Sequence, residues 1–119
     1  MPLKNGRKSE AEEQSALFQW AQYVPELEHM YAVPNGGSRH PAEAANLKRQ
    51  GVKSGVPDIC LPLPKGSYHG LYIEMKVGRN KPSENQEEWL AYLSSVGYKA
   101  VVCYGFEEAV KQLTWYVNL

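Results

Sequence analysis

The chain has 119 residues, of which 43% are hydrophobic and 22% charged, and its formal net charge is zero. This composition is ordinary for a globular protein with one modest core, and neutrality excludes a simple polybasic nucleic-acid binder. No apolar run could span a bilayer, and the basic N-terminus lacks the apolar stretch of a signal peptide. We expect a flexible arm over residues 1–8, a single domain over 9–119, a cytoplasmic location and no membrane partner.

The first predicted element is a helix that begins at Ser9 and runs to about Tyr23, before Pro25. Ser9 and Glu12 fit a capping box, in which each side chain binds a free backbone N–H of the other residue. The stripe that we expect to be buried is apolar at one end and polar at the other, and it comprises Val24, Ala21, Leu17, Gln14, Glu13 and Glu10.

The central region combines turn signals with an excess of positive charge. Residues 33–40 and 53–57 are predicted loops, and residues 41–50 form a short helix with Pro near its start and Gly beyond its end. From Arg39 to Lys81 there are eight basic and three acidic residues, an excess of five. Such a zone could hold a phosphate backbone, and a set of solvated surface lysines is the alternative.

Two strands are predicted next, over residues 58–63 and 71–77, with a turn at 64–67 between them. In the second strand Leu71, Ile73, Met75 and Val77 alternate with Tyr72, Glu74 and Lys76. This period of two predicts one buried face and one face that carries an acid beside a base. A hairpin of the two strands would bring Asp58 next to Glu74.

A helix, a strand and a helix complete the chain. Ser83 and Gln86 form a second capping box, and the following apolar face comprises Trp89, Leu90, Leu93 and Val96. The strand over 98–104 has little polarity, so we expect it to be central in the sheet. A last amphipathic helix contains Phe106, Val110, Leu113 and Val117. The crossover helix between the second and third strands predicts an α/β fold with a small mixed sheet flanked by helices.

The acid–base face is the candidate catalytic centre. Two carboxylates as close as Asp58 and Glu74 would repel each other unless a cation lay between them, and hard oxygen ligands suit Mg²⁺ or Mn²⁺. Such an ion can polarise a phosphodiester, while Lys76 orients the attacking water or stabilises the transition state. The Met75 carbonyl is a candidate third ligand, and Glu10 could reach a second metal ion or act through water. The alternative for Glu-x-Lys is an exposed ion pair on a strand.

A family resemblance then adds to this interpretation. The run from Gly55 to Leu61, followed by His69 to Lys76, resembles the VRR-NUC family of PD-(D/E)XK nucleases. The resemblance extends over about residues 9–110 and includes Glu10, Gln14, Pro34-Asn35-Gly36-Gly37, Ser83, Gln86, Trp89 and Gly97-Tyr98. It implies a restriction-endonuclease-like core, a divalent metal and cleavage of DNA. Stand-alone members, often from phages, resemble Holliday-junction resolving enzymes and act as dimers, so the implied partners are branched DNA and a second copy of the chain, in the host cytoplasm if the chain is phage-encoded.

Several roles remain open at this stage. Gln86 is either only a capping residue or also a neighbour of the metal, as the resemblance implies. Glu10 is either an ordinary first-turn acid or a site residue, with Glu13 as its rival. The predicted DNA contacts, which could also be only a turn and solvated charges, are Asn35, Gly36, Gly37, Arg39, Lys48, Arg49 and Lys53. The alternative functions are flap trimming, nicking or restriction at the same site, or a catalytically inactive DNA-binding module.

Overall fold

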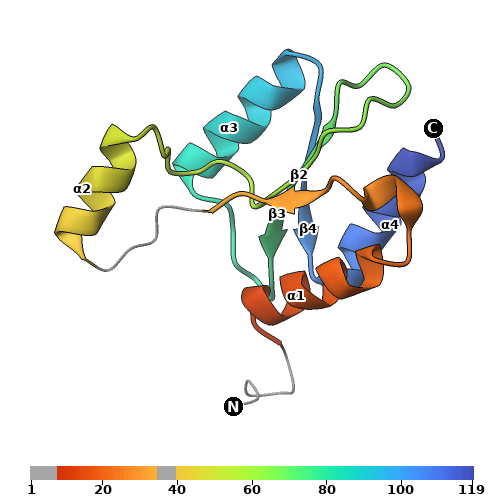
Figure 1. Cartoon of the computed structure of the whole chain (residues 1–119), viewed down its shortest axis with the longest axis horizontal. Coiled ribbons are helices and arrows are strands. Elements are labelled where there is room, and N and C mark those ends of the chain that lie inside the picture. The colour runs from red at the N-terminus through yellow and green to blue at the C-terminus, as the bar shows by residue number, and fades with distance from the viewer. Residues whose placement is uncertain (1–7, 35–39) are drawn as a thin grey trace.

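The computed structural model describes residues 8–34 and 40–119, and these fold into a mixed sheet with surrounding helices (Figure 1). In chain order the elements are α1 (Glu10–Ala21), the 3-10 helix η2 (Pro25–Leu27), β1 (Tyr31–Ala32), α2 (Pro41–Arg49), β2 (Ile59–Leu61), β3 (Leu71–Lys76), α3 (Glu84–Ser95), β4 (Lys99–Tyr104) and α4 (Phe106–Val117). No helix in these two segments is long and apolar enough to cross a membrane.

The four strands are arranged in the order β1-β2-β3-β4. The predicted hairpin is confirmed, because β2 and β3 are antiparallel with Ile59 opposite Ile73 and Leu61 opposite Leu71. The predicted crossover is also confirmed, because α3 connects β3 to the parallel strand β4. The sheet is therefore mixed, as the sequence predicts.

The predicted alternation in β3 divides the two faces of the sheet. Leu71, Ile73 and Met75 are buried and belong to one core cluster with residues of α1 and α4, such as Leu17 and Leu113. The other face carries the polar residues of β3, and Gln86 of α3 contacts it. Burial of the apolar face fixes the strand register, because a slip by one residue would exchange the two faces. The candidate site is thereby held on a rigid support.

Both capping boxes predicted from the sequence are present. Ser9 accepts a hydrogen bond from the backbone N–H of Glu12 at the start of α1, and Ser83 accepts one from that of Gln86 at the start of α3. In each case the side chain of that third helical residue accepts a hydrogen bond from the serine backbone N–H in return. These contacts fix where α1 and α3 begin, which matters for the site below.

Three expectations about the fold were wrong or incomplete. The strand β4 lies at an edge of the described sheet, next to β3 only; its low polarity reflects the packing of α3 and α4 against it. Val96 is exposed, because α3 ends before it and it is the C-cap residue. The short elements η2 and β1 were not predicted, since two or three residues give no detectable period. The helix α2 buries no residue and projects away from the sheet (Figure 1).

Candidate active site

Glu74 is the centre of the candidate site. Its residue is 1% exposed, although a glutamate is rarely buried without a partner. The oxygen Oε2 accepts a hydrogen bond of 3.1 Å from the Gln86 side-chain amide and lies 3.7 Å from Nζ of Lys76. The second oxygen, Oε1, is buried and has no hydrogen-bond partner. An unsatisfied buried carboxylate oxygen is destabilising, which points to a positively charged or hydrogen-bonding group that the protein alone does not supply.

Asp58 lies directly across from Glu74. Extending the register of β2 and β3 by one residue pairs these two positions, and opposite residues of an antiparallel pair project from the same face. The Asp58 oxygen Oδ2 accepts a hydrogen bond of 2.8 Å from the backbone N–H of Met75, where β2 has already ended. Since N–H and C=O of one strand residue point to the same neighbour, we expect the Met75 carbonyl to face the Asp58 side as well.

The pKa of Glu74 reflects this crowding. Burial, as the largest cause, and the negative charge of Asp58 together raise the pKa of the Glu74 carboxyl group from 4.5 to about 8. Lys76 lowers the pKa, whereas Glu10 raises it. At neutral pH the carboxyl group of Glu74 is therefore mostly protonated until a cation compensates its charge.

The structure distinguishes Glu10 from its rival Glu13. The Glu13 carboxylate accepts a hydrogen bond of 2.8 Å from the backbone N–H of Phe106, so it caps the start of α4. The negative charge of Glu10 raises the pKa of Glu74. The Glu10 carboxylate accepts a hydrogen bond of 3.5 Å from the Asn80 side-chain amide. Glu10 thus lies toward the site, and Glu13 has a separate structural task.

Gln86 both caps α3 and contacts Glu74. Its side-chain oxygen accepts a hydrogen bond of 2.8 Å from the backbone N–H of Ser83, which completes the capping box. Its side-chain nitrogen donates to Glu74. The cap therefore also positions the amide that holds one oxygen of Glu74.

The donor set fits a hard divalent cation. Across the described residues no three His, Cys, Asp or Glu side chains gather as a metal site, so side chains alone would provide only Asp58 and Glu74. The Met75 carbonyl and water would complete the oxygen shell, which suits Mg²⁺ or Mn²⁺ because these ions retain several water ligands. The orphaned oxygen of Glu74 is the observation that supports this fit.

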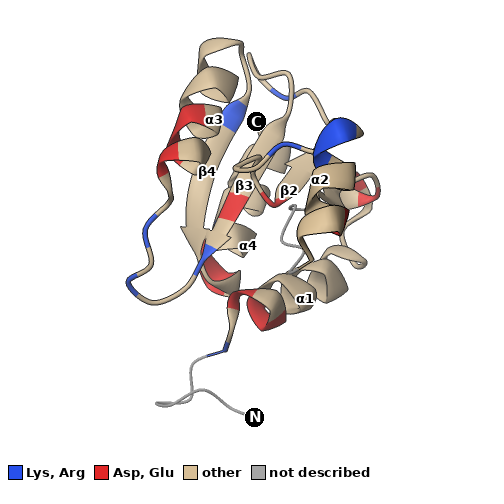
Figure 2. Cartoon of the chain, turned by 90° about the vertical axis from the view of Figure 1, so that its left-hand side faces the viewer, with Lys and Arg blue, Asp and Glu red and all other residues tan. Residues whose placement is uncertain are grey.

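The predicted DNA-contact residues fall into two groups. Lys48, Arg49 and Lys53 are exposed, whereas Asn35, Gly36, Gly37 and Arg39 lie outside the described residues. Figure 2 shows basic segments at the end of α2 and in the neighbouring loop, and acidic segments at the start of α1 and on α3. Six of the 13 acidic residues lie on α1 and α3.

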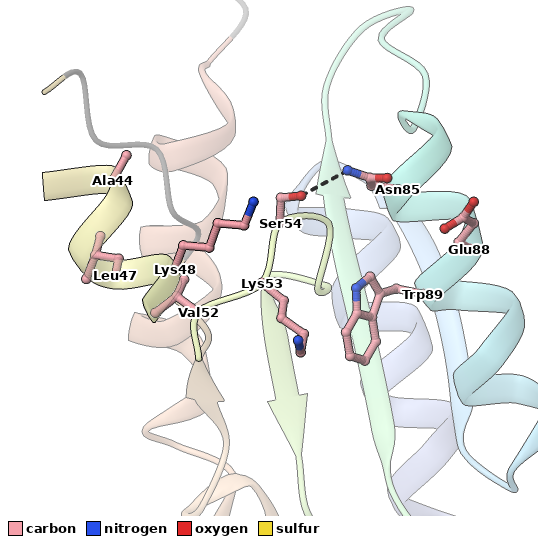
Figure 3. Close-up of a pocket in the computed structure, with 9 residues that line it drawn as sticks. All are labelled: Ala44, Leu47, Lys48, Val52, Lys53, Ser54, Asn85, Glu88 and Trp89. Carbon is pink, nitrogen blue, oxygen red and sulfur yellow. Dashed lines mark hydrogen bonds between the residues drawn. The ribbon is translucent and has the colours of Figure 1, made fainter. Parts of the chain in front are cut away.

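A groove that sequence reasoning missed lies between α2 and α3 (Figure 3). It has a volume of about 570 Å³, and its lining includes Lys48, Lys53 and Trp89. Ser54 accepts a hydrogen bond of 2.9 Å from the Asn85 side-chain amide and thereby joins the loop after α2 to α3. The groove exists only because distant parts of the chain meet, as do Ser54 and Asn85, which are 31 positions apart.

Fold and site together define a class: a mixed α/β domain with two acidic residues and a lysine where an antiparallel strand pair ends. Comparisons with known proteins agree. A family model described as the VRR-NUC domain matches residues 7–107. A solved structure described as a "VRR_NUC domain protein" is 31% identical, with a TM-score of 0.84 over 95% of this chain and 91% of that chain. None of the curated proteins compared with the chain matches it. The chain belongs to the VRR-NUC domain family, which is a nuclease family.

Proposed function

We propose that this protein is a Mg²⁺- or Mn²⁺-dependent endonuclease that hydrolyses phosphodiester bonds of branched DNA, such as a Holliday junction. The observation that carries the proposal is the buried Glu74 carboxyl group, which has one unpartnered oxygen and lies beside Asp58 and Lys76. In this reading Asp58, Glu74 and the Met75 carbonyl hold the ion, and Glu10 supports it. A bound ion supplies positive charge that stabilises the phosphodiester transition state.

The protein's own groups then have separate tasks. The Lys76 ammonium group stabilises the negative charge that develops on the phosphate, or orients the attacking water. Gln86 keeps the Glu74 carboxylate in position through its hydrogen bond of 3.1 Å. The exposed side chains of Lys48, Arg49 and Lys53 neutralise the DNA backbone, so that binding weakens as salt concentration rises.

The proposed substrate also motivates a homodimer. A four-way junction is resolved by paired cuts, and a twofold symmetric assembly presents two equivalent active sites. Sedimentation of the protein with and without junction DNA tests this part. A monomer bound to each junction would contradict it and would favour flap trimming, nicking or restriction on the same site.

Cleavage of a junction, a flap and a linear duplex, each with Mg²⁺ and with chelator, tests the proposed activity. We expect metal-dependent cutting with the junction as the best substrate. Lys76→Ala should bind junction DNA as the parent does and lose most cleavage, about 100-fold or more, because one preorganised charge at a transition state contributes about 3 kcal/mol. Equal cutting rates of this variant and the parent would remove Lys76 from the mechanism, and a parent that binds DNA but never cuts would favour an inactive DNA-binding module.

A further inference from the structure

The groove between α2 and α3 combines an aromatic surface with positive charge. Its nine lining residues include Lys48 and Lys53 but only one acidic side chain, Glu88, so the lining carries a net positive charge. Trp89 and Lys53 extend into the same space from its two sides (Figure 3). Leu47 and Val52 add aliphatic lining on the α2 side (Figure 3).

The loop on one side of this groove is fixed against the start of α3 on the other side. Ser54 and Asn85 are joined by a hydrogen bond of 2.9 Å, and a Cβ at Gly55 would lie only 2.7 Å from the backbone carbon of Asn85. Gly55 also has φ +89°, a conformation that residues with a side chain rarely adopt. The loop that carries Lys53 is thus held tightly against the first turn of α3.

The groove is connected to the candidate site through the same supports. Trp89 follows Gln86 by three positions on α3, so the two side chains share one side of the helix within about one turn of 5.4 Å. Gln86 contacts Glu74, and the loop that carries Lys53 leads into Asp58. A nucleotide in the groove would therefore lie next to the candidate cutting centre.

We propose that this groove binds one unpaired nucleotide of the DNA substrate, with its base on Trp89 and its flanking phosphates near Lys48 and Lys53. An indole offers a flat surface to any base, but only to a base outside the duplex stack. A volume of about 570 Å³ lies within the range of small-molecule sites, which is about 300–1,000 Å³. The proposal rests on the proposed nuclease function and deepens it, because a base that leaves the stack at the branch point, in a four-way junction as in a forked duplex, would then help to determine substrate choice.

The test is DNA binding in the presence of chelator, which excludes cleavage and separates this proposal from the nuclease activity. The probe is a Y-shaped DNA with 2-aminopurine in the unpaired arm beside the branch, compared with a blunt duplex of equal length. We expect the parent to quench the probe by stacking. Trp89→Ala should weaken binding of the Y-shaped DNA by roughly 5- to 100-fold, with little change for the duplex, and Trp89→Phe should retain most of the affinity.

Trp115→Ala is the matched control, because Trp115 is 45% exposed and packs against Tyr68 of another region. Circular dichroism and thermal melting check that each variant folds. Should Trp89→Ala fail to fold, Lys53→Gln changes an exposed side chain and should lower the slope of log K against log salt by about one for the Y-shaped DNA. Unquenched 2-aminopurine in the parent, or unchanged affinity of folded Trp89→Ala together with an unchanged salt slope of Lys53→Gln, would overturn the proposal.

Discussion

Replacing Glu74 by Gln tests how strongly the buried carboxyl group opposes folding without metal. The unfolded chain loses the Glu74 proton near pH 4.5, whereas the folded protein keeps it until about pH 8. Between these values the folded state binds more protons, so raising the pH favours unfolding. Glu74→Gln has nearly the same shape and cannot ionise, so it should be free of this pH dependence.

The magnitude follows from linkage. One proton retained only by the folded state lowers the free energy of unfolding by about 1.4 kcal/mol for each pH unit. From pH 5 to pH 8 the parent should therefore lose about 3 kcal/mol relative to Glu74→Gln. That is a large part of the total stability of a small domain, which is about 5–15 kcal/mol.

Urea unfolding with chelator present, at several pH values from 5 to 8.5, measures this difference directly. Subtracting the two curves of unfolding free energy against pH removes the contribution of every titrating group that both proteins share. Glu26→Gln, which changes an exposed carboxylate in η2, is the control and should follow the parent. If the free energies of unfolding of the parent and Glu74→Gln differed by a constant amount at all pH values, the buried acid would have no raised pKa and the reasoning would be refuted.

Two further predictions concern the supports of the site. Gly55→Ala should have a free energy of unfolding more than about 1 kcal/mol below that of Gly51→Ala, as measured by urea unfolding. Both glycines have positive φ, but only position 55 is crowded by Asn85. Similar losses in both variants would show that φ alone matters. Ser83→Ala should lose about 1 kcal/mol of stability, because the backbone N–H of Gln86 loses its acceptor. It should also slow cleavage, because the first turn of α3, which carries Gln86 beside Glu74, is then less firmly fixed, whereas Ser83→Thr keeps both properties. Unchanged cleavage by Ser83→Ala would show that the backbone N–H of residue 83, which still binds the Gln86 side chain, is enough to hold it.

The features predicted correctly from the sequence are those that depend on residues close together in the chain. The alternation in β3 needs only the two-residue period of a strand, and the capping boxes at Ser9 and Ser83 need only neighbouring residues. A turn between two neighbouring strands predicts a hairpin, which brings Asp58 next to Glu74. These expectations are confirmed.

Other features depend on contacts between distant segments. The low polarity of β4 indicates that helices cover it, and it carries no information on whether the strand is central or at an edge. First-turn acids are common in any helix, so the choice between Glu10 and Glu13 required knowing that Glu13 binds the N–H of Phe106. The groove around Trp89 arises from the approach of α2 and α3, which no local pattern encodes.

Binding of Mn²⁺ to the parent at pH 7, measured by calorimetry in two buffers of different ionisation heat, tests the central claim most directly. A carboxyl group with a pKa of about 8 is mostly protonated at this pH and must lose its proton to act as a ligand. We therefore expect Mn²⁺ to bind with release of roughly one proton for each ion, and Glu74→Gln to lose both signals. Absence of Mn²⁺ binding, or binding that survives unchanged in Glu74→Gln, would contradict a metal centre formed by Asp58 and Glu74.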